Sequence, residues 1–98
     1  MITYPARDMS NGKMVGIEAD DKKVLLAMVN GHYYAIRNVC THMACTLSDG
    51  TLTGDHVQCP CHGSTFDVKT GVLIRGPARL PETAYPVRTE GENIIIDA

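Results

Sequence analysis

The chain has 98 residues, 44% of them hydrophobic, which suffices for one small domain. Nine Lys and Arg residues face eleven carboxylates, and the net charge of −2 argues against a nucleic-acid-binding face or a polybasic membrane surface. The longest apolar run, residues 24–29, is far shorter than the roughly 18 residues of a membrane helix. The first ten residues lack the apolar stretch of a secretory signal, so we expect a cytoplasmic chain.

Strands and tight turns explain the first third of the chain, because no apolar repeat at helical spacing persists over three turns. Residues 14–18 form the first run rich in β-forming side chains. Asn30-Gly31, whose two residues tolerate positive φ, predicts a hairpin that joins residues 24–29 to residues 33–37.

The middle of the chain, residues 38–78, holds all four cysteines and two further predicted hairpins. One turns at Gly54 between residues 51–52 and 56–58, and the other turns at Gly71 between residues 65–67 and 72–74. Residues 85–89 and 93–97 predict a last hairpin. We therefore expect an all-β fold: a small antiparallel sandwich or barrel of residues 1–98, with residues 38–78 inserted as a metal-bearing subdomain.

Two clusters of Cys and His carry the chemistry of this insertion. Cys40 and His42 lie in the first cluster, Cys59 and His62 in the second, and Cys45 and Cys61 accompany them. Without an export signal, such clusters indicate a metal site before a disulfide framework. The residues leave three interpretations open: a structural zinc site, a thiol–disulfide enzyme, and an iron–sulfur centre with two imidazole ligands.

The spacing of the ligands weighs against the first two interpretations. The pairs are C-x-H and C-x-x-H, whereas zinc modules use C-x₂₋₄-C knuckles, and no helix is predicted nearby. Cys59-Pro60-Cys61 is C-x-C, and the C-x-x-C and βαβ pattern of thioredoxin-like enzymes are missing.

The pattern Cys40-x-His42 followed by Cys59-x-x-His62-Gly63 resembles the Rieske family of 2Fe–2S proteins. Flanking features extend the resemblance along the chain: Asn30-Gly31 before Tyr33-Tyr34-Ala35-Ile36, Phe66-Asp67, Thr70-Gly71 and Gly76-Pro77-Ala78. The resemblance implies the Rieske fold and one 2Fe–2S cluster, with Cys40 and Cys59 on the buried iron and His42 and His62 on the outer iron. Such a centre is neutral when oxidised and singly negative when reduced, which favours a higher potential than four thiolates allow.

The resemblance also assigns roles to neighbours of the ligands. Cys45 and Cys61 match an extra pair that forms a disulfide in cytochrome bc-type Rieske proteins and that oxygenase ferredoxins usually lack. The alternative is that the two cysteines are unpaired and serve as small buried hydrophobic residues. Ser64 matches a serine that donates to a bridging sulfide, Phe66 replaces a Tyr that donates to a cysteine sulfur, and Pro77 matches the loop covering the cluster.

These assignments imply a potential above roughly 0 mV but below the top of the family span of about −150 to +300 mV. The function implied is that of a soluble, monomeric one-electron carrier between a reductase and an acceptor, and not that of an enzyme. The alternative is a Rieske subunit of a larger oxidoreductase, such as a bc-like complex, a molybdenum oxidase or an oxygenase system. The cysteine pair favours the subunit, and the absence of an anchor helix favours the carrier. Arg75 and Arg79 are either solvated charges or part of a docking rim.

Overall fold

The structure, a computed structural model, describes residues 1–19, 21–41, 45–61 and 63–98. Within them, antiparallel strands form three sheets, accompanied by two short 3-10 helices. The elements in chain order are β1 (Ile2–Pro5), η1 (Ala6–Asp8), β2 (Met14–Ala19), β3 (Lys22–Val29), β4 (His32–Arg37), η2 (Leu47–Asp49), β5 (Thr51–Thr53), β6 (His56–Gln58), β7 (Thr65–Asp67), β8 (Leu73–Arg75), β9 (Ala84–Tyr85), β10 (Val87–Glu90) and β11 (Asn93–Ile96). No helix among the described residues is long and apolar enough to cross a membrane.

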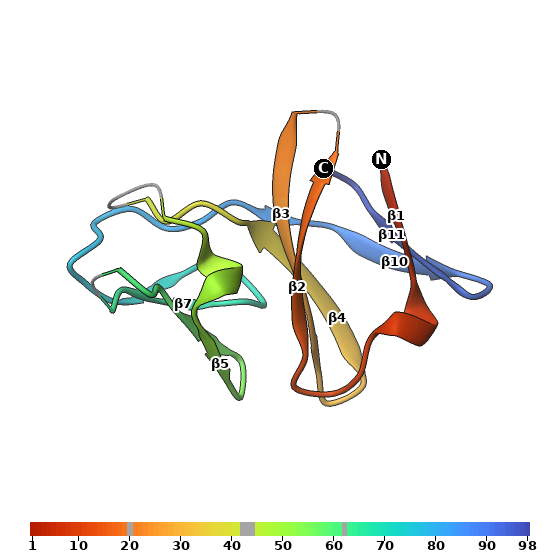
Figure 1. Ribbon diagram of the computed structural model, residues 1–98, viewed down its shortest axis with the longest axis horizontal. Helices are drawn as coiled ribbons and strands as arrows, with labels where there is room; N and C mark the ends of the chain where they lie inside the picture. The colour runs from red at the N-terminus through yellow and green to blue at the C-terminus, as the bar shows by residue number, and fades with distance from the viewer. Residues whose placement is uncertain (20, 42–44, 62) are drawn as a thin grey trace.

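The three sheets have the strand orders β1-β11-β10, β2-β3-β4-β9 and β5-β6-β7-β8. In Figure 1 the strands β2, β3 and β4 lie between β1, β10 and β11 on one side and β5 and β7 on the other. The third sheet comes wholly from residues 51–75, whereas the other two combine segments that precede residue 38 and follow residue 83.

Strand β3 explains why the middle sheet separates two hydrophobic cores. Successive side chains of a strand point to opposite faces. Val24 and Leu26 pack on one face and Leu25 and Ala27 on the other, and all four side chains are fully buried. The uninterrupted apolar run in this part of the sequence therefore reflects a strand covered on both faces.

The core on the face of Val24 and Leu26 is here called the basal core, and the other is called the loop-side core. The basal core comprises Ile2, Met9, Val24, Leu26, Ala35, Ile94 and Ile96. The loop-side core comprises Leu25, Ala27, Ile36, Cys40, Leu47, Val57, Cys59, Phe66, Val68 and Ala78. Two of the expected ligands, Cys40 and Cys59, thus belong to the core of the molecule.

The expected all-β antiparallel fold is confirmed, including the hairpin at Asn30-Gly31. Both residues have positive φ, at 51° and 80°, and Val29 pairs with His32 across the turn. The first strand was not expected: β1 pairs with β11 over four residues, from Ile2 opposite Ile96 to Pro5 opposite Asn93. Its partner lies at the other end of the chain, so no local turn signal marks it.

Two other strands differ from the expected ranges. The run 85–89 divides into β9 and β10 at Pro86, which has no N–H to donate to a sheet. The predicted strand 72–74 is β8, Leu73–Arg75, which is displaced by one residue and pairs with β7 across an irregularity at Thr65 and Phe66. A one-residue bulge of this kind shifts the register without leaving a mark in the apolar pattern.

Candidate metal centre

The first ligand loop is closed at its base by backbone pairing. Val39 and Thr46 form an isolated antiparallel bridge, and the Cys40 N–H donates to the Cys45 carbonyl at 2.8 Å. Cys40 is 2% exposed, so its thiol is buried in the loop-side core. The expected ligand His42 lies outside the described residues.

The second ligand loop is closed in the same way. The Cys59 N–H donates to the Ser64 carbonyl at 2.7 Å, and the Gly63 N–H donates back to the Cys59 carbonyl at 3.2 Å. Gly63 adopts a φ of 81°, a left-handed conformation that glycine reaches without steric cost. Cys59 is also 2% exposed, and the expected ligand His62 lies outside the described residues.

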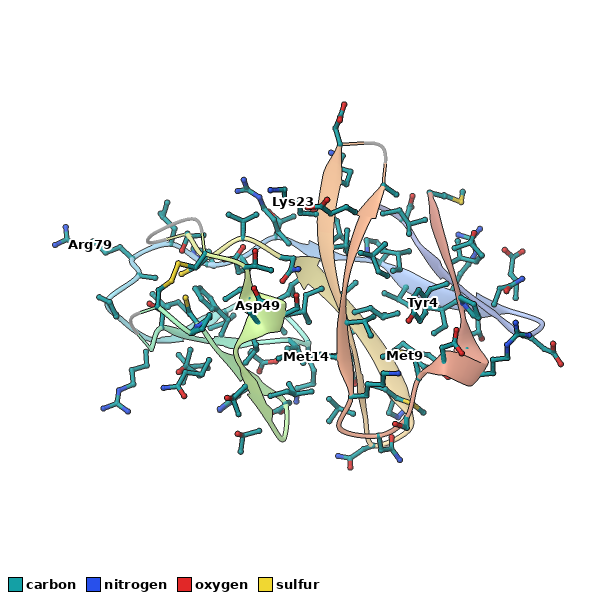
Figure 2. All side chains as sticks on the ribbon, viewed as in Figure 1. Tyr4, Met9, Met14, Lys23, Asp49 and Arg79 are labelled. Carbon is teal, nitrogen blue, oxygen red and sulfur yellow. A yellow bond between two sulfur atoms is a disulfide. The ribbon has the colours of Figure 1, made fainter. Side chains whose placement is uncertain are left out.

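A disulfide between Cys45 and Cys61 joins the two loops, which is the pairing implied by the resemblance to bc-type proteins. The sulfur–sulfur bond is visible in Figure 2 beside the loops. The sulfur atoms of Cys45, Cys59 and Cys61 all lie within 4.8 Å of one another. The cross-link therefore holds the two loops together next to one of the expected ligands.

Residues 76–83, here called the strap, connect β8 to β9 and bond to both loops. The Ala78 N–H donates to the Ser64 hydroxyl at 2.9 Å in a buried position. On the first loop, the Thr41 hydroxyl donates to the Leu80 carbonyl at 2.8 Å, and the Thr41 N–H donates to Glu82 Oε2 at 3.1 Å. The strap thus fixes one loop relative to the other.

Pro77 lies in the strap after a cis peptide bond with Gly76 and is exposed. Together with Thr41, Arg79 and Leu80 it lines a hollow beside the first ligand loop. Arg79 extends away from the body of the molecule at the loop end in Figure 2. The strap therefore lies against the first loop, as expected of a covering segment, while its role toward a cluster stays a prediction.

The donors that the structure describes fit an iron–sulfur centre. Two buried thiols, Cys40 and Cys59, come from two short closed loops, as needed for ligands of a protected iron. Ser64 is fully buried, and its hydroxyl accepts a bond from Ala78, which leaves the hydroxyl hydrogen for another acceptor. Phe66 is fully buried in the core that also contains both thiols.

Glu82 is one of two buried polar residues that the sequence did not indicate. It is only 4% exposed, and burial raises its pKa from 4.5 to about 7, opposed by the hydrogen bond from Thr41 and the charge of Arg37. A single Glu between Pro81 and Thr83 in a loop has the sequence signature of a solvated charge. No signal in the sequence distinguishes it from the exposed carboxylates.

Asn38 was missed as well. It is 5% exposed; its side-chain amide donates to the Ser48 hydroxyl at 2.9 Å and accepts from the Ser48 N–H at 2.8 Å. A side chain at Gly16 would collide with this pair, so glycine is required where β2 passes it. Asn38 therefore ties the end of β4 to η2, directly before the first ligand loop.

A second group of possible ligands, Asp55, His56 and Asp67, places its ligand atoms within 4.8 Å of one another. Lys69 neutralises this group. Its side-chain ammonium lies 2.8 Å from Asp55 Oδ2, and its backbone N–H donates to Asp67 Oδ1 at 2.7 Å. Hydrogen bonding with Lys69 holds the pKa of Asp55 below its usual range. This group is an ordinary surface ion-pair cluster where β6 begins and β7 ends.

The fold, the loops and the donor set define the class of protein. The family model for the Rieske [2Fe-2S] domain matches residues 1–87, and the chain belongs to that family. Its cofactor is accordingly a 2Fe–2S cluster, which exchanges one electron at a time.

Relatives narrow the class further. The chain is 38% identical to the ferredoxin component of the naphthalene 1,2-dioxygenase system of Pseudomonas aeruginosa over 90 residues, which cover 92% of this chain and 86% of that protein. It is also 38% identical to the 3-phenylpropionate/cinnamic acid dioxygenase ferredoxin subunit of Escherichia coli strain K12 over 94 residues, covering 95% and 88%.

A solved structure agrees with these relatives. The ferredoxin of carbazole 1,9a-dioxygenase from Nocardioides aromaticivorans IC177 superposes with a TM-score of 0.90 at 28% identity, covering 96% of this chain and 92% of that one. The chain is an electron-transfer protein of the Rieske ferredoxin type and is not itself an enzyme.

Proposed function

We propose that this chain carries single electrons from a reductase to the terminal oxygenase of an aromatic-ring dioxygenase system, with Cys40, His42, Cys59 and His62 as the ligands of its cluster. The observation that carries the proposal is the pair of buried thiols, Cys40 and Cys59, presented by two closed loops in a chain that spans most of its ferredoxin relatives. Residues 38–78 are proposed as the cluster-binding subdomain, and the cytoplasm as the location.

The protein's own residues prepare the site for electron transfer in three ways. Burial of Cys40 and Cys59 keeps water from the inner ligands. Ser64 has a hydroxyl hydrogen available, and a donor to the centre stabilises the added electron. The disulfide and the strap hold the loops in one arrangement, which limits the reorganisation that accompanies a change of charge.

The ligand set is tested by analysis of the purified protein. We expect a red-brown protein with about two irons and two labile sulfides per chain, and a reduced form with the low average g-value of imidazole-ligated clusters. A colourless protein that contains one zinc would contradict the proposal. His42→Cys should yield either no cluster or one of markedly lower potential, because a negative thiolate in place of a neutral imidazole on that iron opposes reduction.

The transport role is tested by reconstitution. The chain is added to the reductase and oxygenase components of a naphthalene 1,2-dioxygenase system from which the ferredoxin has been omitted, and product formation is followed. Turnover that depends on the chain supports the proposed role, with the cluster-free protein as control. A loaded protein that restores no turnover with these components, or with those of a carbazole dioxygenase, would contradict the assigned partner class.

The second candidate, a subunit of a larger oxidoreductase, is favoured by the Cys45–Cys61 disulfide alone. Size-exclusion chromatography of native extract separates the two. A carrier elutes near the 10.6 kDa of the single chain, whereas a subunit co-elutes with its enzyme. The potential adds a second criterion: a value well below 0 mV places the protein with the oxygenase ferredoxins despite its disulfide.

A further inference from the structure

Glu82 is a buried carboxyl group that has no role in the proposed electron-transfer site as described above. It lies in the strap, is 4% exposed, and bonds through Oε2 to the Thr41 N–H at 3.1 Å. That N–H belongs to the peptide between Cys40 and Thr41, in the middle of the first ligand loop. The other carboxylate oxygen of Glu82, Oε1, is buried and has no hydrogen-bond partner among the residues that the structure describes.

The backbone holds this carboxyl group in place from the opposite side. The Glu82 N–H donates to the Gly71 carbonyl at 2.8 Å, and a Cβ at Gly71 would collide with the Glu82 carbonyl. The next residue, Thr83, accepts from the Arg37 N–H at 2.9 Å at the end of β4. The main chain at Glu82 is therefore fixed on both sides, and the bond from the Thr41 N–H holds the side chain against the first ligand loop.

A purely structural clamp does not require a carboxylate at this position. An amide oxygen could also accept the Thr41 N–H, at a smaller desolvation cost than that of a buried carboxylate, which raises the pKa of Glu82. Arg37 is the charged side chain that acts on Glu82, and it is exposed, so it compensates this charge only in part. What glutamate adds over glutamine is a negative charge beside the first ligand loop.

We propose that Glu82 is a positioning and tuning residue of the centre: its carboxylate anchors the Cys40–Thr41 peptide to the strap, and its charge lowers the reduction potential. The sign follows from electrostatics. The reduced cluster carries one more negative charge than the oxidised cluster, so a nearby carboxylate disfavours reduction. This inference rests on the proposed function, because it concerns the same centre.

The test is the reduction potential of Glu82→Gln, measured by protein-film voltammetry at pH 9. Glutamine keeps an acceptor for Thr41 and removes the charge. We expect the equilibrium constant for reduction to rise about tenfold, which is about 59 mV for a one-electron couple. Glu92→Gln, on the exposed β10–β11 turn, makes the same charge change at the far end of the molecule and should shift the constant less than twofold.

A second control separates charge from looseness of the strap. Thr41→Val removes the hydroxyl bond to Leu80 and leaves the charge unchanged, so it measures the shift in potential that a loosened strap alone produces, and this shift should be smaller than that of Glu82→Gln. Equal shifts in Thr41→Val and Glu82→Gln, or no greater shift in Glu82→Gln than in Glu92→Gln, would overturn the inference. Iron and sulfide are determined first: a zinc protein overturns the proposed function, whereas a 2Fe–2S protein with an unmoved potential overturns only the role of Glu82.

Discussion

The two halves of the molecule are stabilised by different means. The basal core consists of aliphatic side chains and Met9. It lies on the sheet that contains the long strands β2 and β3, which pair over six positions. The loop-side half has strands of three residues, β5 to β8. The buried polar or charged side chains among the described residues, Asn38, Ser64 and Glu82, all lie at the end of β4 or beyond it, in the loop-side half. In the loop-side half, where the strands are short, hydrogen bonds of buried side chains and a disulfide add to the stabilisation by sheet pairing.

A matched pair of cavities in β3 tests whether the two cores are independent. Leu25 and Leu26 are adjacent and fully buried, but face opposite cores. Leu25→Ala and Leu26→Ala should each lower the free energy of unfolding by roughly 3–5 kcal/mol in urea titrations. Only Leu25→Ala should also shift the potential and hasten cluster loss, because Leu25 shares its core with Cys40 and Cys59. Equal shifts in both variants would show that the two cores are not independent.

Removing the disulfide should affect the loop-side half alone. The double variant Cys45→Ser/Cys61→Ser opens a loop of sequence separation 16, a change worth roughly 3 kcal/mol in the chain-entropy model. Visible absorbance of the cluster should decay faster, while far-UV circular dichroism from the basal sheets is retained. Thiol titration of the unfolded, unreduced, cluster-free parent protein should find two thiols per chain. Four thiols would mean that the purified protein lacks the bridge.

Strands joined by local turns could be predicted from the sequence in both halves, whereas pairing between distant segments could not. Apolar runs and the Asn30-Gly31 turn predict β2, β3 and β4, because local alternation and turn chemistry determine them. Strand β1 was missed because its partner β11 is at the other end of the chain. The division at Pro86 could have been foreseen, since proline interrupts a central strand.

In the loop-side half, the motif predicted more than periodicity did. The spacing of cysteines and histidines indicated the family and, through it, the pairing of Cys45 with Cys61. The three buried polar side chains were a different matter, because only Ser64 lies inside the motif. Asn38 and Glu82 are buried by contacts with Ser48 and Thr41, which are 10 and 41 residues away in the chain. Contacts of this kind leave no periodic trace.

The pH dependence of stability provides a smaller effect specific to the loop-side half. The folded state holds the proton of Glu82 with a pKa of about 7, against 4.5 in the unfolded chain, so the stability contributed by this proton is complete below pH 4.5 and is lost as the pH rises through about 7. From pH 5.5 to 8 the loss should be about 2 kcal/mol. Unfolding of the parent protein and of Glu82→Gln at both pH values measures it, because other titrating groups cancel in the difference. A difference that stays constant with pH would contradict the raised pKa.

An effect of comparable size is expected at Ser64, where one hydroxyl links the strap to the second ligand loop. Ser64→Ala leaves the buried Ala78 N–H without its acceptor, which should cost about 1–3 kcal/mol of unfolding free energy. The potential should fall as well, because the hydroxyl no longer stabilises the added electron. Ser10→Ala, at an exposed serine of the basal half, is the matched control and should change neither quantity. A loss of stability with an unchanged potential would show that Ser64 serves the strap alone, and would remove the hydroxyl from the groups that tune the cluster.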